Sequence, residues 1–344
     1  MSTKKKAPAK KASMKLAGGS CEQTGRARGD EHLAEPKKRW SARVKRLLFV
    51  RNFRRPTGGN VSLRDYFFHA LADPRFDTRI WFAPSSRHLD SDLWRHLPHD
   101  RVVDAPNWGD TDFVFVNGKD WRLLPPRPYA FRVVHLVQHL GYADDPELRE
   151  YLARPALRIC LSDAACDAIG PHANGPFCVI PSAIDPALFY DGSTRGRGSV
   201  LIWGSKSPQL AIAIRERLPQ ANVDILTDWI SREEFAARLR TTDIFVGLTM
   251  LREGFYRPAL EAMACGCAVV CNDAHGNRAH CIADVTCLQP PHGEAGAHAE
   301  AVRRLLDDDA LAERLREQGR ALAQDFTLEV ERARLHEAFD SLLA

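Results

Sequence analysis

The sequence has no long apolar run, and this absence argues against several classes of protein. No stretch among its 344 residues approaches the roughly 18 consecutive apolar residues that a membrane-spanning helix needs. The first residues, MSTKKKAPAKKASMKLAGG, are basic and lack an apolar core, so we expect no secretory signal there. No repeat with a period of roughly 20–50 residues is present, which argues against a repeat architecture.

A paired C-x2-C spacing is lacking as well. The nine cysteines are an odd number in a long chain, which is typical of reduced thiols in a cytoplasmic protein. Cys265, Cys267, Cys271 and Cys281 lie near two histidines in the sequence, but residues 268–271 have the pattern of a buried strand. We therefore expect small buried thiols rather than a zinc site.

The positive charge is unevenly distributed along the chain. Residues 1–40 hold 11 Lys and Arg against 4 Asp and Glu, so the rest of the chain is slightly acidic although the net charge is +4. This segment has too little apolar surface to fold, and we predict a disordered basic tail. Weak contact with an anionic membrane surface is the alternative role of the tail. Nucleic-acid binding is not expected, because interleaved aromatics and a binding motif are lacking.

Strand-like and helix-like segments alternate along the rest of the chain. The first series, in residues 41–185, has strand patterns at 46–50, 78–82, 112–116, 132–137 and 157–162, with a helical pattern at 61–71. A second series, in residues 186–326, begins with a strand pattern at 199–203. Such alternation predicts parallel sheets covered on both faces by helices. We therefore predict an α/β fold with two Rossmann-like domains facing each other across a cleft, and a final helix at 327–344.

Residues 252–270, REGFYRPALEAMACGCAVV, are the most informative stretch. Pro258 suits the first turn of a helix, and Gly266 suits its end. Glu253 then lies in the loop before the helix, and Glu261 lies about one turn inside it. The two carboxylates therefore lie on either side of the helix start.

A helix start provides free backbone N–H groups that bind anions. Here those groups belong to Gly254, Phe255 and Tyr256, and a diphosphate bound to them would lie between the two glutamates. A carboxylate accepts hydrogen bonds from hydroxyl groups. The ligand that fits would have phosphates in the middle and a polyhydroxylated ring at each end, as a nucleotide-diphosphate-sugar has.

These residues resemble the E-x7-E motif of GT-B glycosyltransferases, and in particular the retaining enzymes of family 4. The resemblance extends over most of residues 46–343. Residues 179–185, VIPSAID, resemble the family's interdomain linker, and residues 276–281, GNRAHC, resemble a turn of a bacterial polysaccharide subgroup. The glycine turn that follows the first strand in the family matches Gly58, Gly59 and Asn60.

The resemblance implies a role for each matching residue. Glu253 would contact the sugar hydroxyls, Glu261 would bind the ribose, and the amides between them would hold the phosphates. Lys206 would neutralise the leaving diphosphate. A residue after a strand of the first domain would face the sugar, and the match is open between Gln138 and His139.

Two positions depart from the family pattern. Arg257 stands where the family usually has Leu, and Tyr256 stands where it usually has Gly. Arg257 either adds a cation near the phosphates or narrows the pocket.

The resemblance implies transfer of a sugar from a nucleotide-diphosphate-sugar donor to a glycan or lipid-linked acceptor, with retention and without metal or cofactor. The expected setting is bacterial cell-surface polysaccharide biosynthesis, in the cytoplasm or on the inner face of the membrane. Two alternatives stay open: a sugar-nucleotide 2-epimerase of the same architecture, and a catalytically silent scaffold tethered by its basic tail.

Three D-x-D stretches raise the alternative of a metal-dependent GT-A enzyme. They begin at Asp90, Asp110 and Asp307. A metal-binding D-x-D is expected at the end of a buried strand, whereas these precede a helix, precede a strand, or lie between helices. We therefore expect no metal.

Overall fold

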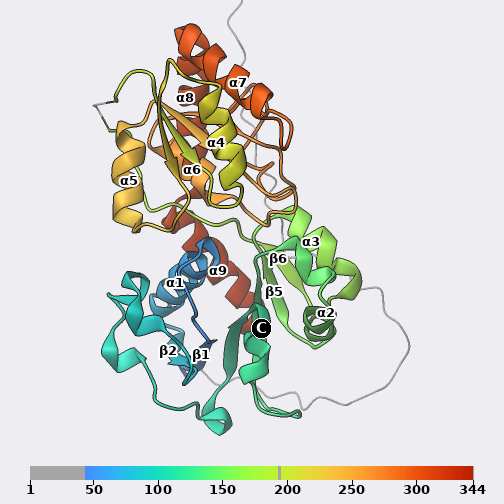
Figure 1. Ribbon diagram of the computed structural model, residues 1–344. Helices are drawn as coiled ribbons and strands as arrows, with labels where there is room; N and C mark the ends of the chain where they lie inside the picture. The colour runs from blue at the N-terminus through green and yellow to red at the C-terminus, as the bar shows by residue number, and fades with distance from the viewer. Residues whose placement is uncertain (1–42, 193–194, 344) are drawn as a thin grey trace, which may run out of the picture.

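The computed structural model describes residues 43–192 and 195–343, so the predicted basic tail lies outside the described residues. Within the described part, two parallel sheets form two α/β domains, one above the other in Figure 1. The predicted fold class is therefore confirmed. No helix in these two ranges is long and apolar enough to cross a membrane.

The first domain is built on a six-stranded parallel sheet in the order β2-β1-β3-β4-β5-β6. Its strands are β1 (Lys45–Arg51), β2 (Phe76–Phe82), β3 (Phe113–Asn117), β4 (Arg132–Val137), β5 (Leu157–Cys160) and β6 (Phe177–Val179). The residues of β3 are all buried, as expected for a central parallel strand covered on both faces.

The second domain is built on a four-stranded parallel sheet in the order β10-β9-β7-β8. Its strands are β7 (Ser199–Trp203), β8 (Asn222–Leu226), β9 (Ile244–Gly247) and β10 (Ala268–Cys271). In each sheet the strand order changes direction beside the first strand, β1 or β7. This is the position at which open α/β sheets bind ligands.

Helices connect and cover the strands. They are α1 (Gly58–Leu71), α2 (Pro146–Leu152), α3 (Asp163–Ile169), α4 (Pro208–Glu216), α5 (Arg232–Thr241), α6 (Arg257–Ala264), α7 (Ala295–Asp307), α8 (Asp309–Ala323) and α9 (Leu328–Leu343). Short 3₁₀ helices occupy several of the loops. Two of them, His88–Asp90 and Asp92–Trp94, contain the first D-x-D stretch.

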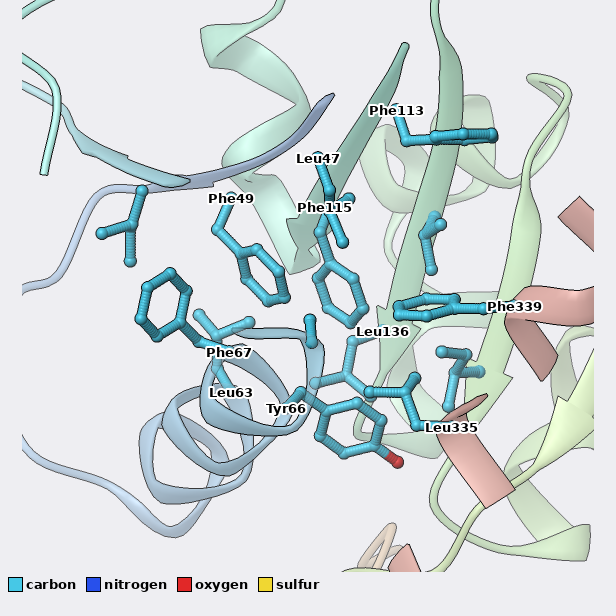
Figure 2. Close-up of a cluster of buried hydrophobic side chains, with 14 of the residues drawn as sticks. Leu47, Phe49, Leu63, Tyr66, Phe67, Phe113, Phe115, Leu136, Leu335 and Phe339 are labelled. Carbon is cyan, nitrogen blue, oxygen red and sulfur yellow. The ribbon is translucent and has the colours of Figure 1, made fainter. Parts of the chain in front are cut away.

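Helix α9 ends the chain on the first domain. It runs alongside α1 in Figure 1, and Figure 2 shows its Leu335 and Phe339 pointing into the cluster of aromatic and leucine side chains beneath the first sheet. The ring of Phe339 lies 4.9 Å from that of Phe76 between centroids. A buried pair adds to this packing, because His69 Nε2 lies 2.8 Å from Glu331 Oε2.

Helix α6 forms as the sequence predicts. Pro258 is its second residue, and Gly266 follows its end with φ of +77°, a conformation that glycine adopts at little cost. The neighbouring cysteines are free, buried thiols within the second domain's core. In the described ranges, no group of three or more His, Cys, Asp and Glu side chains is placed to hold a metal ion.

Candidate functional site

A cleft of about 660 Å³ lies between the two domains. The loops that line it follow the carboxyl ends of β1, β4, β5 and β6 in the first domain and of β7, β8 and β9 in the second. The start of α6 closes one wall. The residues that line the cleft include Gly58, Gly59, Gln138, His139, Ser182, Trp203, Lys206, Trp229, Arg232, Glu253, Phe255, Tyr256, Arg257 and Glu261.

Glu253 is buried and pairs with Lys206 across the floor of the cleft. Lys206 Nζ contacts Glu253 Oε1, which also accepts a hydrogen bond from the backbone N–H of Met250 at 3.3 Å. The ammonium of Lys206 lies 5.8 Å from the ring centroid of Tyr256. Within the described residues, no group donates to Glu253 Oε2, so this oxygen is available to a ligand hydroxyl.

The backbone N–H groups at the start of α6 are also available. Those of Gly254, Phe255, Tyr256 and Arg257 donate to no acceptor in the described part of the chain. Phe255, Tyr256 and Arg257 line the cleft, whereas Gly254, also predicted to bind the donor, is packed against the Gln138 backbone and does not line it. Unpaired amides at a helix N-terminus favour an anion.

Glu261 lies one turn further along α6 and is held by two arginines. Its Oε1 accepts from Arg232 Nη1 at 2.7 Å and from Arg257 Nε at 3.2 Å. Its Oε2 has no donor among the described residues, while the side chain lines the cleft. Each glutamate of the motif therefore has one oxygen fixed by protein cations and the other without a protein partner.

Arg257 does more than line the cleft. Its Nη1 donates to Ser62 Oγ and to Asp65 Oδ2 in α1, both at 3.3 Å, while its Nε contacts Glu261. Only 5% of the residue is exposed. Of the two roles predicted for Arg257, a buried position that narrows the pocket fits this geometry better than a cation directed at phosphate.

The structure brings both Gln138 and His139 to the cleft, in different ways. The Gln138 amide is held within the first domain: Nε2 donates to Gly59 O at 2.6 Å, and Oε1 accepts from Asn117 at 2.9 Å. His139 Nδ1 accepts from Gly141 N at 2.9 Å, which leaves Nε2 without a protein partner in the described ranges. Burial lowers the pKa of His139, assisted by Lys206 and Arg252 and opposed by Glu253, so the ring is neutral near pH 7.

The glycine turn lies at the start of α1. Gly59 packs against Gln138, and a Cβ at position 59 would lie 2.4 Å from Gln138 Oε1. Gly58 has open space beside it. Asn60, predicted to bind the donor, lies behind the turn, where its side chain bonds Arg51, Thr57 and the Arg55 carbonyl.

Several lining residues were not predicted from the sequence. Arg232 begins α5 and is partly buried against Phe189, with its guanidinium carbon 4.5 Å from the ring centroid. Trp229 and Ser182 also line the cleft. The signal for Arg232 and Trp229 was their place just after β8, because ligands bind beyond the carboxyl ends of strands.

The comparisons with known proteins agree with this architecture. Residues 199–322 match the profile of the family described as "Glycosyl transferases group 1". Sucrose-phosphate synthase from Thermosynechococcus elongatus superposes with a TM-score of 0.67 at 17% identity, covering 87% of this chain and 99% of that one. The fold is GT-B. A comparison with curated proteins gives no significant match.

Two further GT-B structures resemble the chain. HepE from Anabaena, in complex with UDP and glucose, has a TM-score of 0.69 at 15% identity, with 86% of this chain and 100% of that one covered. A glycosyltransferase from Rickettsia africae has a TM-score of 0.62 at 11% identity, with 87% and 98% covered. The segment that matches the group 1 profile contains Lys206, Arg232 and both glutamates of the GT-B cleft.

Proposed function

We propose that this protein is a glycosyltransferase that moves a sugar from a nucleotide-diphosphate-sugar to a glycan or lipid-linked acceptor. The observation that carries the proposal is the arrangement around the start of α6. Unpaired backbone amides lie between Glu253 and Glu261, and each glutamate has an oxygen without a protein partner. Backbone N–H groups that bind an anion lie between two carboxylates that accept hydrogen bonds from hydroxyl groups. This arrangement matches a diphosphate that joins two sugar rings.

The residues of the cleft suggest how the reaction would proceed. The amides and Lys206 stabilise charge on the diphosphate as the bond between the anomeric carbon and the phosphate oxygen breaks. The acceptor hydroxyl forms the new bond on the face of the anomeric carbon from which the phosphate departs, and attack from this face gives retention. The proton of the hydroxyl passes to the departing phosphate. Orientation of the two substrates supplies the rest of the acceleration. No step requires a carboxylate nucleophile, a metal or a cofactor.

The comparisons support a nucleotide-sugar donor. HepE has been solved with UDP and with UDP-glucose, and its fold is the same. By the sequence resemblance, we further propose a place in bacterial cell-surface polysaccharide synthesis and membership of family 4. The same resemblance and the basic tail lead us to propose a cytoplasmic location, with contact at the inner face of the membrane.

Thermal unfolding with UDP, GDP, dTDP, CMP and ADP tests the proposal. A nucleotide at about 100 times its dissociation constant adds about 2.7 kcal/mol to stability. We expect one of the five to raise the midpoint for the parent and to fail with Glu261→Gln, while Glu317→Gln on the exposed face of α8 keeps the shift. If none raises the midpoint of the parent at millimolar concentration, the silent-scaffold alternative is favoured instead.

Product analysis separates the two enzymatic alternatives. When the protein is incubated with the matching nucleotide-sugar and no acceptor, we expect a transferase to turn over very little of the nucleotide-sugar. Steady conversion of the sugar ring without acceptor would instead identify a 2-epimerase.

A further inference from the structure

We propose that Arg257 and Asp65 form a buried link between the two domains that positions Glu261 for the donor's ribose and holds the cleft closed. This inference rests on the proposed function for the identity of the ligand. The link consists of three side chains, Asp65, Arg257 and Glu261, from α1 of the first domain and α6 of the second.

The guanidinium of Arg257 bridges two carboxylates with separate nitrogens. Nη1 lies 3.3 Å from Asp65 Oδ2, and Nε lies 3.2 Å from Glu261 Oε1. Because the guanidinium is a rigid plane, a shift of α1 relative to α6 moves the nitrogen that holds Glu261. Arg232 also holds Oε1 of Glu261 from within the second domain, so contact between the domains sets the position of the carboxylate together with Arg232.

Because the three side chains are buried, each charge in the link depends on its protein partner. Asp65, Arg257 and Glu261 are 3%, 5% and 1% exposed, so none can exchange its partners for water while the domains are closed. Asp65 is satisfied on both oxygens, since Arg64 Nη2 lies 2.6 Å from Oδ1. Burial alone would raise the pKa of Asp65, but Arg64 and Arg257 outweigh it and keep the carboxylate ionised.

Asp65 does not line the cleft, which makes it the informative position to change. Asp65→Asn keeps the shape and removes the charge that holds Arg257. We expect the dissociation constant of the stabilising nucleotide to rise by about tenfold, within the usual range of coupling between sites. The donor KM should rise with it while kcat changes less, a split that a merely structural defect would not give.

The exposed interdomain pair Arg252–Asp144 provides the matched control. It also bridges the domains, but its side chains are 50% and 57% exposed and it does not touch Glu261. Asp144→Asn should leave the nucleotide affinity within about twofold, because exposed pairs contribute little. Equal losses from Asp65→Asn and Asp144→Asn would overturn the proposal.

A double-mutant cycle tests the link even if no nucleotide binds the parent. Asp65→Asn, Arg257→Leu and the double variant are compared by urea unfolding and by the radius of gyration in solution scattering. We expect a clear coupling between the two changes and a larger radius for each single variant. Additive effects with an unchanged radius would overturn the link, whereas absence of nucleotide binding alone would overturn only the proposed function. If Arg257→Leu fails to fold, Asp65→Asn still gives both readouts.

Discussion

At the scale of single residues, the sequence identifies the two glutamates, Lys206 and Arg257 as site residues, but it does not show how they pair or that Arg232 joins them. Glu253 and Glu261 are recognisable because they share one short motif with the helix start. Arg257 lies only four residues before Glu261, but two other partners are distant in the chain: Lys206 is 47 residues before Glu253, and Arg232 is 29 residues before Glu261. Only the folded arrangement of β7, β8 and α6 brings them together, so no local pattern could reveal the pairing.

Lys206 is the residue whose charge should matter most to the rate. In Lys206→Met, Glu253 loses its cationic partner, and the diphosphate of the proposed donor would lose a cation that stabilises its charge in the transition state. We expect kcat to fall by about 10²–10³-fold, the range seen when one such stabilising group is removed. The measurement is the steady-state release of nucleotide from the donor class that binds.

A matched lysine elsewhere controls for loss of charge. Lys119 pairs with Asp145 and Glu147 on the first domain, away from the cleft. Lys119→Met should keep kcat within a small factor. A comparable loss in both variants would argue against a specific role for Lys206.

At the scale of elements, the sequence predicts most strands and helices and misses the short ones. The strand patterns at 132–137 and 199–203 coincide with β4 and β7, because each is a short apolar run bounded by polar or turn residues. The sequence does not predict helix α2 and the 3₁₀ helices, because their one or two turns show no clear helical period of apolar residues. A contact from the turn around His280 supports the start of α6, because the His280 ring is hydrogen-bonded to the Tyr256 carbonyl.

His280 holds the start of α6 and should make stability depend on pH. Its Nε2 lies 3.0 Å from the Tyr256 carbonyl, and burial lowers its pKa to about 4. The unfolded chain binds a proton below about pH 6.5, whereas the native ring stays neutral until about pH 4. Stability from this group is therefore present at neutral pH and is lost as the pH falls, by up to about 3 kcal/mol.

Urea unfolding between about pH 7.5 and about pH 4.5 measures this contribution. In His280→Gln, which keeps a donor for the carbonyl but does not titrate, the free energy of unfolding should fall less over this range. Parallel profiles for parent and variant would show that the pH dependence arises elsewhere, for example at His135, whose pKa burial also lowers.

At the scale of the whole molecule, helix α9 ties the end of the chain to the first domain. Phe339 is fully buried among the rings of the first core (Figure 2). Phe339→Ala should lower the free energy of unfolding by about 3–5 kcal/mol, because it removes a large side chain and leaves a cavity. Glu337→Ala, on the exposed side of the same helix, should change it by no more than about 0.5 kcal/mol in denaturant unfolding.

The backbones of the two domains approach each other closely where Gly254 meets Gln138. A Cβ on Gly254 would lie 2.0 Å from the Gln138 backbone oxygen in the opposite domain, a clash that no side-chain rotation can relieve. Gly254→Ala should therefore open the cleft, raise the radius of gyration and weaken nucleotide binding.

Gly296→Ala is the control, because position 296 lies in α7 with nothing within 4 Å of the added methyl group. It should raise stability by up to about 1 kcal/mol through helix propensity and leave the radius unchanged. If Gly254→Ala keeps the parent's radius and affinity, the closed contact at Gln138 is not required for binding. The closed arrangement would then depend on other contacts between the domains, such as the Arg257–Asp65 link.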